Sequence, residues 1–240
     1  MNHDQKTEVF FNRLKALNCF QDYQIERSGK YTSFYIEDSN RMSIVQFGDF
    51  FKCEVKMISC CVVFKVLANY IDNSQDYLNY SSSVTWGSHS RMTGHEFGRG
   101  IYEHLPLSWQ DDESAGRLVE LIEKYMRQDA EPFFDYWTDV RVFLPYIEGD
   151  YYDFSKMTDA LGDLVMAKTV IWYQCAHPEY EDFVNFMIEK RKSRIVNEPD
   201  RRSGLEKTLP KLIALDKKLK ESPPLYEWDP KYLIKKAFKV

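Results

Sequence analysis

The stretch best suited to binding or chemistry runs from Gly94 to Gly100 and reads Gly-His-Glu-Phe-Gly-Arg-Gly. Its glycines would let a ligand approach the backbone closely, and the Arg99 guanidinium pairs well with a carboxylate or phosphate. Neither the phosphate-loop pattern nor the dinucleotide fingerprint G-x-G-x-x-G occurs in the chain. We therefore favour an ordinary glycine-rich hairpin here, with a binding loop as the alternative.

Three histidines, His89, His95 and His104, lie close together in the sequence, and Glu96 and Glu103 stand beside two of them. Zinc sites use His and carboxylate ligands, but the zinc-binding pattern HExxH and a CxxC pair are both absent. In a strand, His95 and Glu96 would point to opposite faces. We therefore expect no metal and no cofactor, and we interpret these histidines as surface or hydrogen-bonded residues.

The cysteines are odd in number, which favours reduced thiols in a cytoplasm over a disulfide framework. Cys60 and Cys61 are adjacent and lie in an apolar run, where burial would raise the thiol pKa and make both groups inert. The nucleophile-elbow pattern G-x-S-x-G is also absent, so we predict no catalytic residue. The five positions are Cys19, Cys53, Cys60, Cys61 and Cys175.

Aromatic residues are abundant, with 16 Tyr, 16 Phe and 5 Trp. Phe133, Phe134 and Trp137 would share one helix face, which predicts a place in the core. Tyr151 and Tyr152 follow a glycine in a predicted link and are better candidates for an exposed surface.

We predict a binding surface that joins the 94–100 loop to the link at residues 151 and 152. Loops carry function more often than the elements they join, and tyrosines supply contact area at modest entropic cost. The predicted binding residues are Arg99, His95, Tyr151 and Tyr152.

Hydrophobic periodicity predicts the elements that must position this surface. An amphipathic helix comes first, and short strands without intervening helices follow it, which favours an antiparallel sheet. After Trp109 the period changes from two to three and four, as in helices. The expected helices cover 4–17, 111–126, 131–145, 155–172, 177–188 and 205–219 (interrupted at Pro210), with a short one from 229, and the expected strands cover 31–36, 42–47, 51–57, 60–67 and 84–86.

The fold class that follows is α+β: an N-terminal helix, an antiparallel sheet of about five to six strands, then a run of about five helices. We expect residues 87–100 to be irregular and 101–109 to be extended. No glycine- or proline-rich linker lies near Gln110, so we predict one unit over residues 1–240, sheet-rich up to 110 and helical from 111.

Composition narrows the class of protein. The 240 residues are 44% hydrophobic and 29% charged, which excludes a wholly disordered chain, and no apolar run is long enough to cross a membrane. With 32 Lys/Arg against 37 Asp/Glu, nucleic-acid binding is not expected. Only the region Phe186–Val240, with 15 basic and 8 acidic residues, favours an anionic partner; the alternative is that its basic helices face water or dock on the acidic body. No signal peptide is visible at the start, which predicts a cytoplasmic location.

Several packing segments occur in a recognisable order. They are Leu14-Lys-Ala-Leu-Asn18, the paired strands from Tyr31 to Phe47, Leu118-Val-Glu-Leu-Ile-Glu-Lys-Tyr125, Pro132-Phe-Phe134 and Val140-Arg-Val-Phe-Leu144. In this order the chain resembles a bacterial family catalogued as domain of unknown function 4304. The resemblance implies a bacterial source but no activity, and it supplies no catalytic residues. The polar stretch 71–83 is longer than the polar stretch expected at this place in the family.

The sequence thus predicts a non-enzymatic intracellular binding or interaction protein whose partner is another protein. Immunity to a toxin is one role of this kind. The alternative is a small enzyme with its site around Gly94–Gly100, and an adaptor that uses the basic C-terminal region is a third reading.

Overall fold

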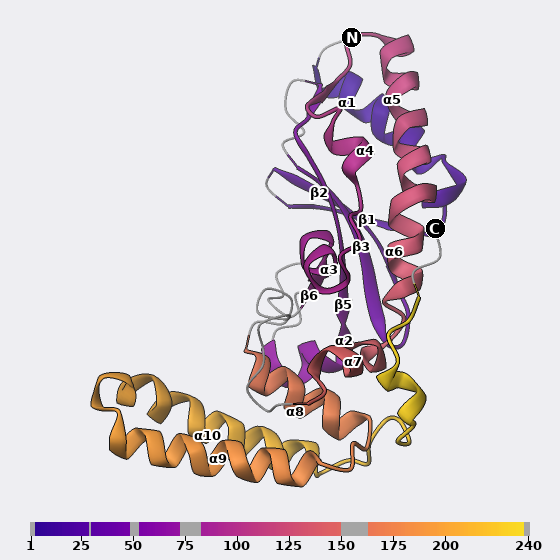
Figure 1. Cartoon of the computed structure of the whole chain (residues 1–240). Helices are drawn as coiled ribbons and strands as arrows, with labels where there is room; N and C mark the ends of the chain where they lie inside the picture. Colours follow the sequence, from indigo (N-terminus) through magenta and orange to yellow (C-terminus); the bar gives the residue numbers. More distant parts are fainter. Residues whose placement is uncertain (1–2, 29, 49–52, 73–82, 150–162, 238–240) are drawn as a thin grey trace. The chain divides into compact units, whose positions relative to one another are not determined.

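The computed structural model describes residues 3–28, 30–48, 53–72, 83–149 and 163–237, drawn as ribbons in Figure 1. The chain divides into two compact units. Unit 1 comprises Met1–Lys65, Ser83–Asp139 and Ala237–Val240, and unit 2 comprises Val66–Ser82 and Val140–Lys236.

Unit 1 contains a five-stranded antiparallel sheet in the order β1-β2-β3-β5-β6. The α+β class, with a first helix, an antiparallel sheet and later helices, is therefore confirmed. The strands are β1 (Gln24–Ser28), β2 (Tyr31–Glu37), β3 (Arg41–Gly48), β5 (Met57–Phe64) and β6 (Ser83–Thr85).

One face of this sheet is covered by helices. Phe34, Val45 and Cys60 are register partners on neighbouring strands and are fully buried on that face. Phe11 of α1 (His3–Lys15) stacks on Phe34 at 6.2 Å, and Tyr125 of α5 (Asp112–Tyr125) reaches Cys60, so both helices cover the same face. The opposite face carries more polar and half-buried side chains, as a sheet packed mainly on one side requires.

Two strand predictions are wrong in their bounds. In its described part, the alternating run 51–57 contains the short strand β4 (Glu54–Val55) and only the first residue of β5, Met57. Strand β4 pairs with β7 (Leu107–Ser108) in a separate two-stranded sheet. The run 60–67 is β5 up to Phe64 and then the short helix α2 (Lys65–Leu67). Burial alternates along the first part of β5, so an apolar run does not by itself mean that both faces are covered.

The segments expected to be irregular or extended between residues 87 and 109 contain two helices. These are α3 (Trp86–Thr93) and α4 (Arg99–Tyr102). Helix α3 begins with a capping box at Thr85. These local hydrogen bonds outweigh the weak helix propensity of glycine, serine and histidine.

The helix expected over residues 131–145 is broken into pieces. Helix α6 (Glu131–Tyr136) ends where Trp137 leaves the helical region, with φ −90° and ψ 61°. A 3₁₀ turn (Val140–Phe143) and helix α7 (Leu144–Ile147) follow, and Pro145 lies in the first turn of α7, where its missing N–H costs nothing. The predicted core positions Phe133, Phe134 and Trp137 are all buried.

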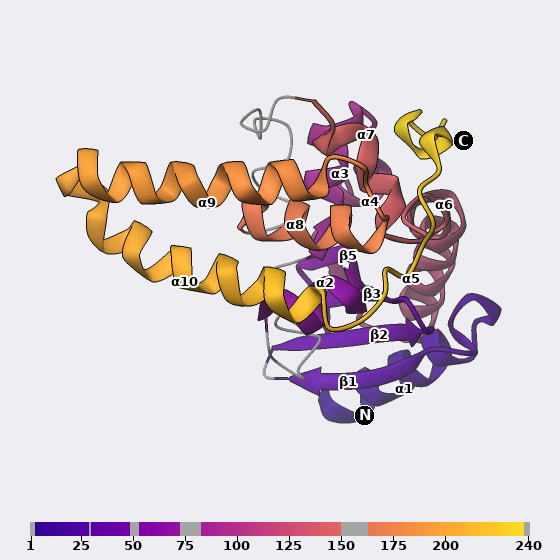
Figure 2. The same ribbon diagram turned by 90° about the horizontal axis from the view of Figure 1, so that it is seen from below.

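Unit 2 is helical. It contains α7, α8 (Leu164–Gln174), α9 (Tyr180–Asn197) and α10 (Arg202–Leu219), and a 3₁₀ turn (Pro230–Leu233) lies near the end. Helices α9 and α10 run side by side as an antiparallel hairpin (Figure 2). The expected interruption at Pro210 is wrong: α10 continues through it, because Pro210 lies on the exposed side, where the carbonyl that it leaves unpaired can face water.

The C-terminal segment is attached to unit 2 by aromatic contacts. The Arg141 guanidinium lies between the rings of Tyr226 and Tyr232, 4.1 and 4.3 Å from their centroids. The amide of Tyr226 also donates to the carbonyl of Gln174 at 2.9 Å. These contacts attach the segment after α10, whose only helical piece in the described residues is the short 3₁₀ turn, to unit 2.

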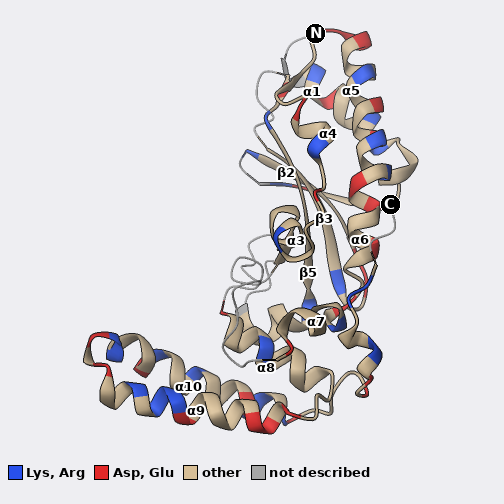
Figure 3. Cartoon of the chain, in the orientation of Figure 1, with Lys and Arg blue, Asp and Glu red and all other residues tan. Residues whose placement is uncertain are grey.

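Helices α9 and α10 both carry basic and acidic residues (Figure 3). Arg194 pairs with Glu198 at 2.8 Å, and Lys220 pairs with Asp216 at 3.0 Å. Part of the positive charge of the C-terminal region is therefore neutralised locally, and its anionic partner stays a prediction. In the described part of the chain, none of the helices is both long and apolar enough to span a bilayer.

The single unit predicted over residues 1–240 stays a prediction. The contacts do place α5 and α6, which lie after residue 110, in the same compact unit as the sheet. The change in the hydrophobic period after Trp109, from two to three and four residues, therefore does not mark the border between the units.

Candidate functional site

Helix α3 is fixed at both ends by its own sequence. The Ser88 amide donates to Oγ1 of Thr85 at 3.3 Å, and the Thr85 amide donates to Oγ of Ser88 at 2.7 Å. Gly94 ends the helix in the left-handed region, with φ 75°. Because Trp86 and Ser90 are four residues apart, they project from the same face of α3.

Gly98 places the link between α3 and α4 directly against the indole of Trp86. Its φ is +72°, and a Cβ added there would lie 2.4 Å from Cζ3 of Trp86. The Gly98 amide donates to Oδ1 of Asp129 at 3.1 Å, which fixes the link to the helical segment after α5. Only glycine is compatible with this backbone conformation and this close approach.

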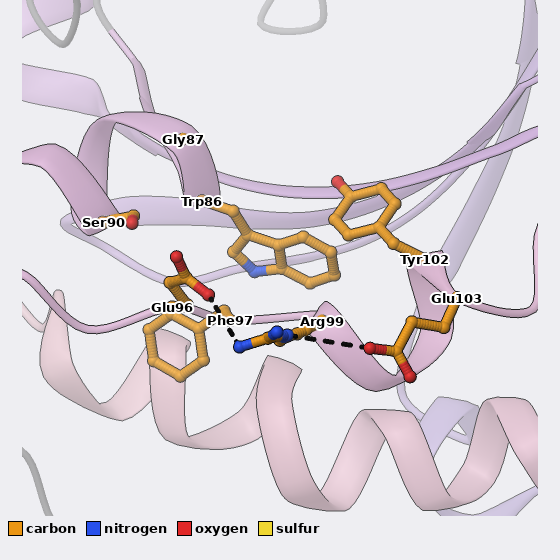
Figure 4. A pocket seen from close by; sticks show the side chains of 8 residues that line it. All are labelled: Trp86, Gly87, Ser90, Glu96, Phe97, Arg99, Tyr102 and Glu103. Carbon is orange, nitrogen blue, oxygen red and sulfur yellow. Dashed lines mark ion pairs between the residues drawn. The ribbon is translucent and has the colours of Figure 1, made fainter.

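Helix α3, the link and helix α4 border a pocket of about 480 Å³ in unit 1 that is open to solvent (Figure 4). Its size falls in the range of ligand sites, roughly 300–1,000 Å³. Three aromatic side chains form part of its wall, and two carboxylates and one guanidinium supply charge. The lining residues are Trp86, Gly87, Ser90, Glu96, Phe97, Arg99, Tyr102 and Glu103.

Trp86 is the most firmly held of these residues. Its side chain is 4% exposed and lies edge-on to Tyr125 and Tyr102, with ring centroids 5.0 and 5.7 Å away. Its Nε1–H is buried and has no hydrogen-bond partner among the described residues. In Figure 4 the indole nitrogen lies on the ring edge that faces Glu96 and Arg99. An acceptor supplied by a ligand would remove the roughly 1–3 kcal/mol that an unsatisfied buried donor costs.

Arg99 stands at the rim with its side chain 78% exposed. Its guanidinium lies 3.8 Å from the Glu96 carboxylate and 3.6 Å from that of Glu103, farther than a hydrogen bond allows. Exposed pairs of this kind contribute at most about 1 kcal/mol to stability. The fold therefore does not depend on Arg99, whose N–H groups can serve a ligand.

The predicted site residues do not all line the pocket. Arg99 lines the pocket, whereas His95 is half-buried beside it and is not a lining residue. The His95 amide donates to Oγ1 of Thr93 at 3.1 Å, and its ring lies edge-on to Phe97 at 4.8 Å. Tyr151 and Tyr152 lie outside the described residues, so the surface predicted to join them to Arg99 stays a prediction.

The glycine-rich hairpin that the sequence favours for residues 94–100 is wrong. This segment links two helices, because Gly94 ends α3 and Gly98 immediately precedes α4. His95 and Glu96 are therefore not strand neighbours on opposite faces.

His89 belongs to the core of unit 1. It is fully buried, and Nε1–H of Trp137 donates to its Nδ1 at 3.0 Å. Burial, and to a smaller extent His95, lowers the pKa of His89 to about 3, so the ring is neutral at ordinary pH. No cluster of three or more His, Cys, Asp or Glu side chains within the described ranges could hold a metal ion.

Cys60 and Cys61 point to opposite faces of β5. Cys60 is fully buried, with its Sγ 3.2 Å from the hydroxyl of Tyr125, and Cys61 is half-buried. Burial raises the pKa of the Cys60 thiol well above its usual value and that of Cys61 to about 12. Both thiols therefore stay protonated at neutral pH.

We expect Cys60 and Cys61 to react slowly with a thiol reagent at pH 8 in the native protein and fast in urea. At a pKa near 12 only about one thiol in ten thousand is ionised at that pH, and the thiolate is the reactive form. Mass spectrometry of timed labelling reactions measures both sites. Rapid labelling of the native protein at these two positions would instead indicate an exposed, reactive pair.

No protein-family model matches the chain, and neither a curated protein nor a solved structure matches it. The resemblance to the family of unknown function 4304 therefore stays a prediction.

Several residues of the pocket were not predicted from the sequence as binding residues. Trp86 and Ser90 could have been found from helix signals, since Thr85 and Ser88 form a cap and Gly94 is a stop. Tyr102 gives no comparable signal, and it falls in the segment 101–109 that is expected to be extended. The two carboxylates could have been found from their spacing to Arg99, at three residues before and four residues after.

Proposed function

We propose that the protein is a non-catalytic binding protein and that the pocket at Trp86 is its ligand site. The observation that carries this proposal is the buried Nε1–H of Trp86, a donor without a partner in the described structure, at the wall of a ligand-sized pocket. Buried donors normally have a hydrogen-bond acceptor. A buried donor without one, beside a pocket, favours an acceptor that a ligand supplies.

The construction of the pocket supports the same function. Trp86 is clamped between Gly98 and two tyrosine rings, so its ring is already in place before a ligand arrives. Binding to such a preorganised wall costs little ordering of side chains. Aromatic walls with a few polar groups are typical of sites that hold small molecules or anchoring side chains of a partner protein.

The small-enzyme alternative has less support at this site. Both carboxylates of the pocket pair with Arg99, and the described structure contains no hydrogen bond that would link either of them to the hydroxyl of Ser90. A nucleophile needs a base within hydrogen-bond reach. We propose a cytoplasmic location as well, which is supported by the five free thiols.

A pocket-filling variant tests the function. At Gly87 an added Cβ would make only ordinary contacts, 3.8 Å to Arg91 and to Thr85, so Gly87→Leu can place an apolar side chain at the pocket wall without a clash at its Cβ. We expect members of a small-molecule fragment set to raise the melting temperature of the wild type and not of this variant, because a ligand stabilises only the state that binds it.

The matched control is Gly204→Leu, at a helix glycine that has open space and is not a lining residue. It should keep the response of the wild type. If fragments stabilise Gly87→Leu as well as the wild type, or if none stabilises either protein, the pocket is not the ligand site.

A further inference from the structure

We propose that the ligand of the Trp86 pocket carries a carboxylate on an aromatic or apolar body. This inference rests on the proposed function, since it names the chemistry of the ligand at the same site. It follows from which groups of the pocket are donors and which are already engaged.

Two donors converge on one side of the pocket. The Nε1–H of Trp86 is buried and has no acceptor in the described part of the chain, and the guanidinium of Arg99 lies on the side that this nitrogen faces (Figure 4). Because the ion pairs of Arg99 are 3.6 and 3.8 Å long, its N–H groups are not used up in hydrogen bonds to the two glutamates. A planar guanidinium beside an indole N–H can hold the two oxygens of a carboxylate.

The hydroxyl of Ser90 is a further polar group of the pocket lining. Ser90 projects from the same face of α3 as Trp86 and lines the pocket. Ser90 is half-buried, so water only partly hydrates its hydroxyl. Two donors and one adaptable hydroxyl match the small number of oxygens on a carboxylate.

A cationic ligand fits the same groups less well. It would leave the Trp86 donor unsatisfied and would lie beside the positive charge of Arg99. The glutamates that could attract a cation, Glu96 and Glu103, already face Arg99, and both are largely exposed, so water screens them. A phosphate dianion is disfavoured more than a carboxylate, because the second carboxylate of the wall is not balanced by Arg99 and repels a double negative charge more strongly than a single one.

The remaining wall determines the body of the ligand. Phe97 is buried, Tyr102 is 46% exposed, and both line the pocket next to the Trp86 ring. Aromatic rings pack well against such edges and faces. An aromatic carboxylate would thus meet donors with its charged end and rings with its body.

The test compares three probes of similar shape: N-acetyl-L-phenylalanine, its primary amide, and phenethylamine. Binding is followed by the indole ¹H–¹⁵N resonance of Trp86, assigned through its loss in Trp86→Phe. We expect the carboxylate to bind at least about 10-fold more tightly than the amide, since a charge-assisted hydrogen bond is replaced by a neutral one. We also expect the Trp86 resonance to move downfield as its N–H gains an acceptor.

Arg99→Gln should remove most of this preference, so that acid and amide bind within about twofold of each other. The control is Arg117→Gln, since Arg117 is a similarly exposed arginine that also has a glutamate four residues away but does not line the pocket. It should retain the preference.

Each other outcome overturns the inference. Tighter binding of phenethylamine, equal binding of acid and amide to the wild type, an unchanged preference in Arg99→Gln, or binding by none of the probes would each exclude a carboxylate ligand. The proposed function is judged separately, by the fragments that stabilise the wild type and not Gly87→Leu, and it survives any of these results if those fragments exist.

Discussion

Replacing Gly98 with alanine is expected to lower the free energy of unfolding by about 2–5 kcal/mol. A non-glycine residue in the left-handed region costs roughly 1–2 kcal/mol, and forcing a methyl group into a filled space costs roughly 1–3 kcal/mol more. The added Cβ would lie 2.4 Å from Cζ3 and 2.8 Å from Cε3 of Trp86, so the indole or the link must move. Urea denaturation followed by circular dichroism measures the loss.

Two nearby glycines separate the contributions. Gly94 has nearly the same φ, +75°, but open space where its Cβ would lie, so Gly94→Ala should lose only the conformational part, about 1–2 kcal/mol. Gly100 has open space and no positive φ, so Gly100→Ala should be neutral or slightly stabilising. Equal losses in Gly98→Ala and Gly94→Ala would mean that Trp86 does not pack on Gly98, and the wall of the pocket would have to be redrawn.

Replacing Arg41 with methionine is expected to cost about 2–4 kcal/mol, because it removes a charged donor shared by two carbonyl groups. Nη1 of Arg41 donates to the carbonyl of Phe134 and to that of Trp137, the latter at 2.6 Å. These carbonyls lie at the C-terminal end of α6, where a positive charge also complements the helix dipole. Without Arg41 the end of this helix loses its attachment to β3.

Arg41→Lys should recover part of the loss, since an ammonium keeps the charge but lacks the planar fork of donors. Arg117→Met provides the control, because Arg117 is 68% exposed and its ion pair with Glu113 should contribute less than about 1 kcal/mol. Denaturation midpoints in urea compare all three variants. A loss in Arg41→Met no larger than in Arg117→Met would contradict the role assigned to Arg41.

Elements with a long, regular hydrophobic period were predictable from the sequence. Strands β2 and β3 and helix α5 lie close to where their periods indicated, because each has a long buried face. Helix α9 begins near its expected start at 177 but continues to Asn197, past the expected end at 188, because its later turns are charged and largely exposed. Short elements were not predictable in this way. Helix α3 depends on hydrogen bonds between Thr85 and Ser88, and β4 depends on pairing with a strand more than 50 residues away.

The candidate site was predictable only in part. Arg99 could be found because glycines flank it, and glycine marks places where the backbone takes unusual conformations. The pocket itself arises from the packing of Gly98 on Trp86, and no spacing rule connects two residues that meet through a loop. Tyr151 and Tyr152 lie outside the described residues, so their place in the predicted surface stays a prediction.

The most direct measurement of the central claim, that the Trp86 pocket is a ligand site, is a crystal structure with a fragment that raises the melting temperature of the wild type. We expect electron density for the fragment in contact with Trp86 and Arg99, with an acceptor atom within hydrogen-bond distance of Nε1 of Trp86. Density for the fragment at another surface, with this pocket empty, would contradict the claim.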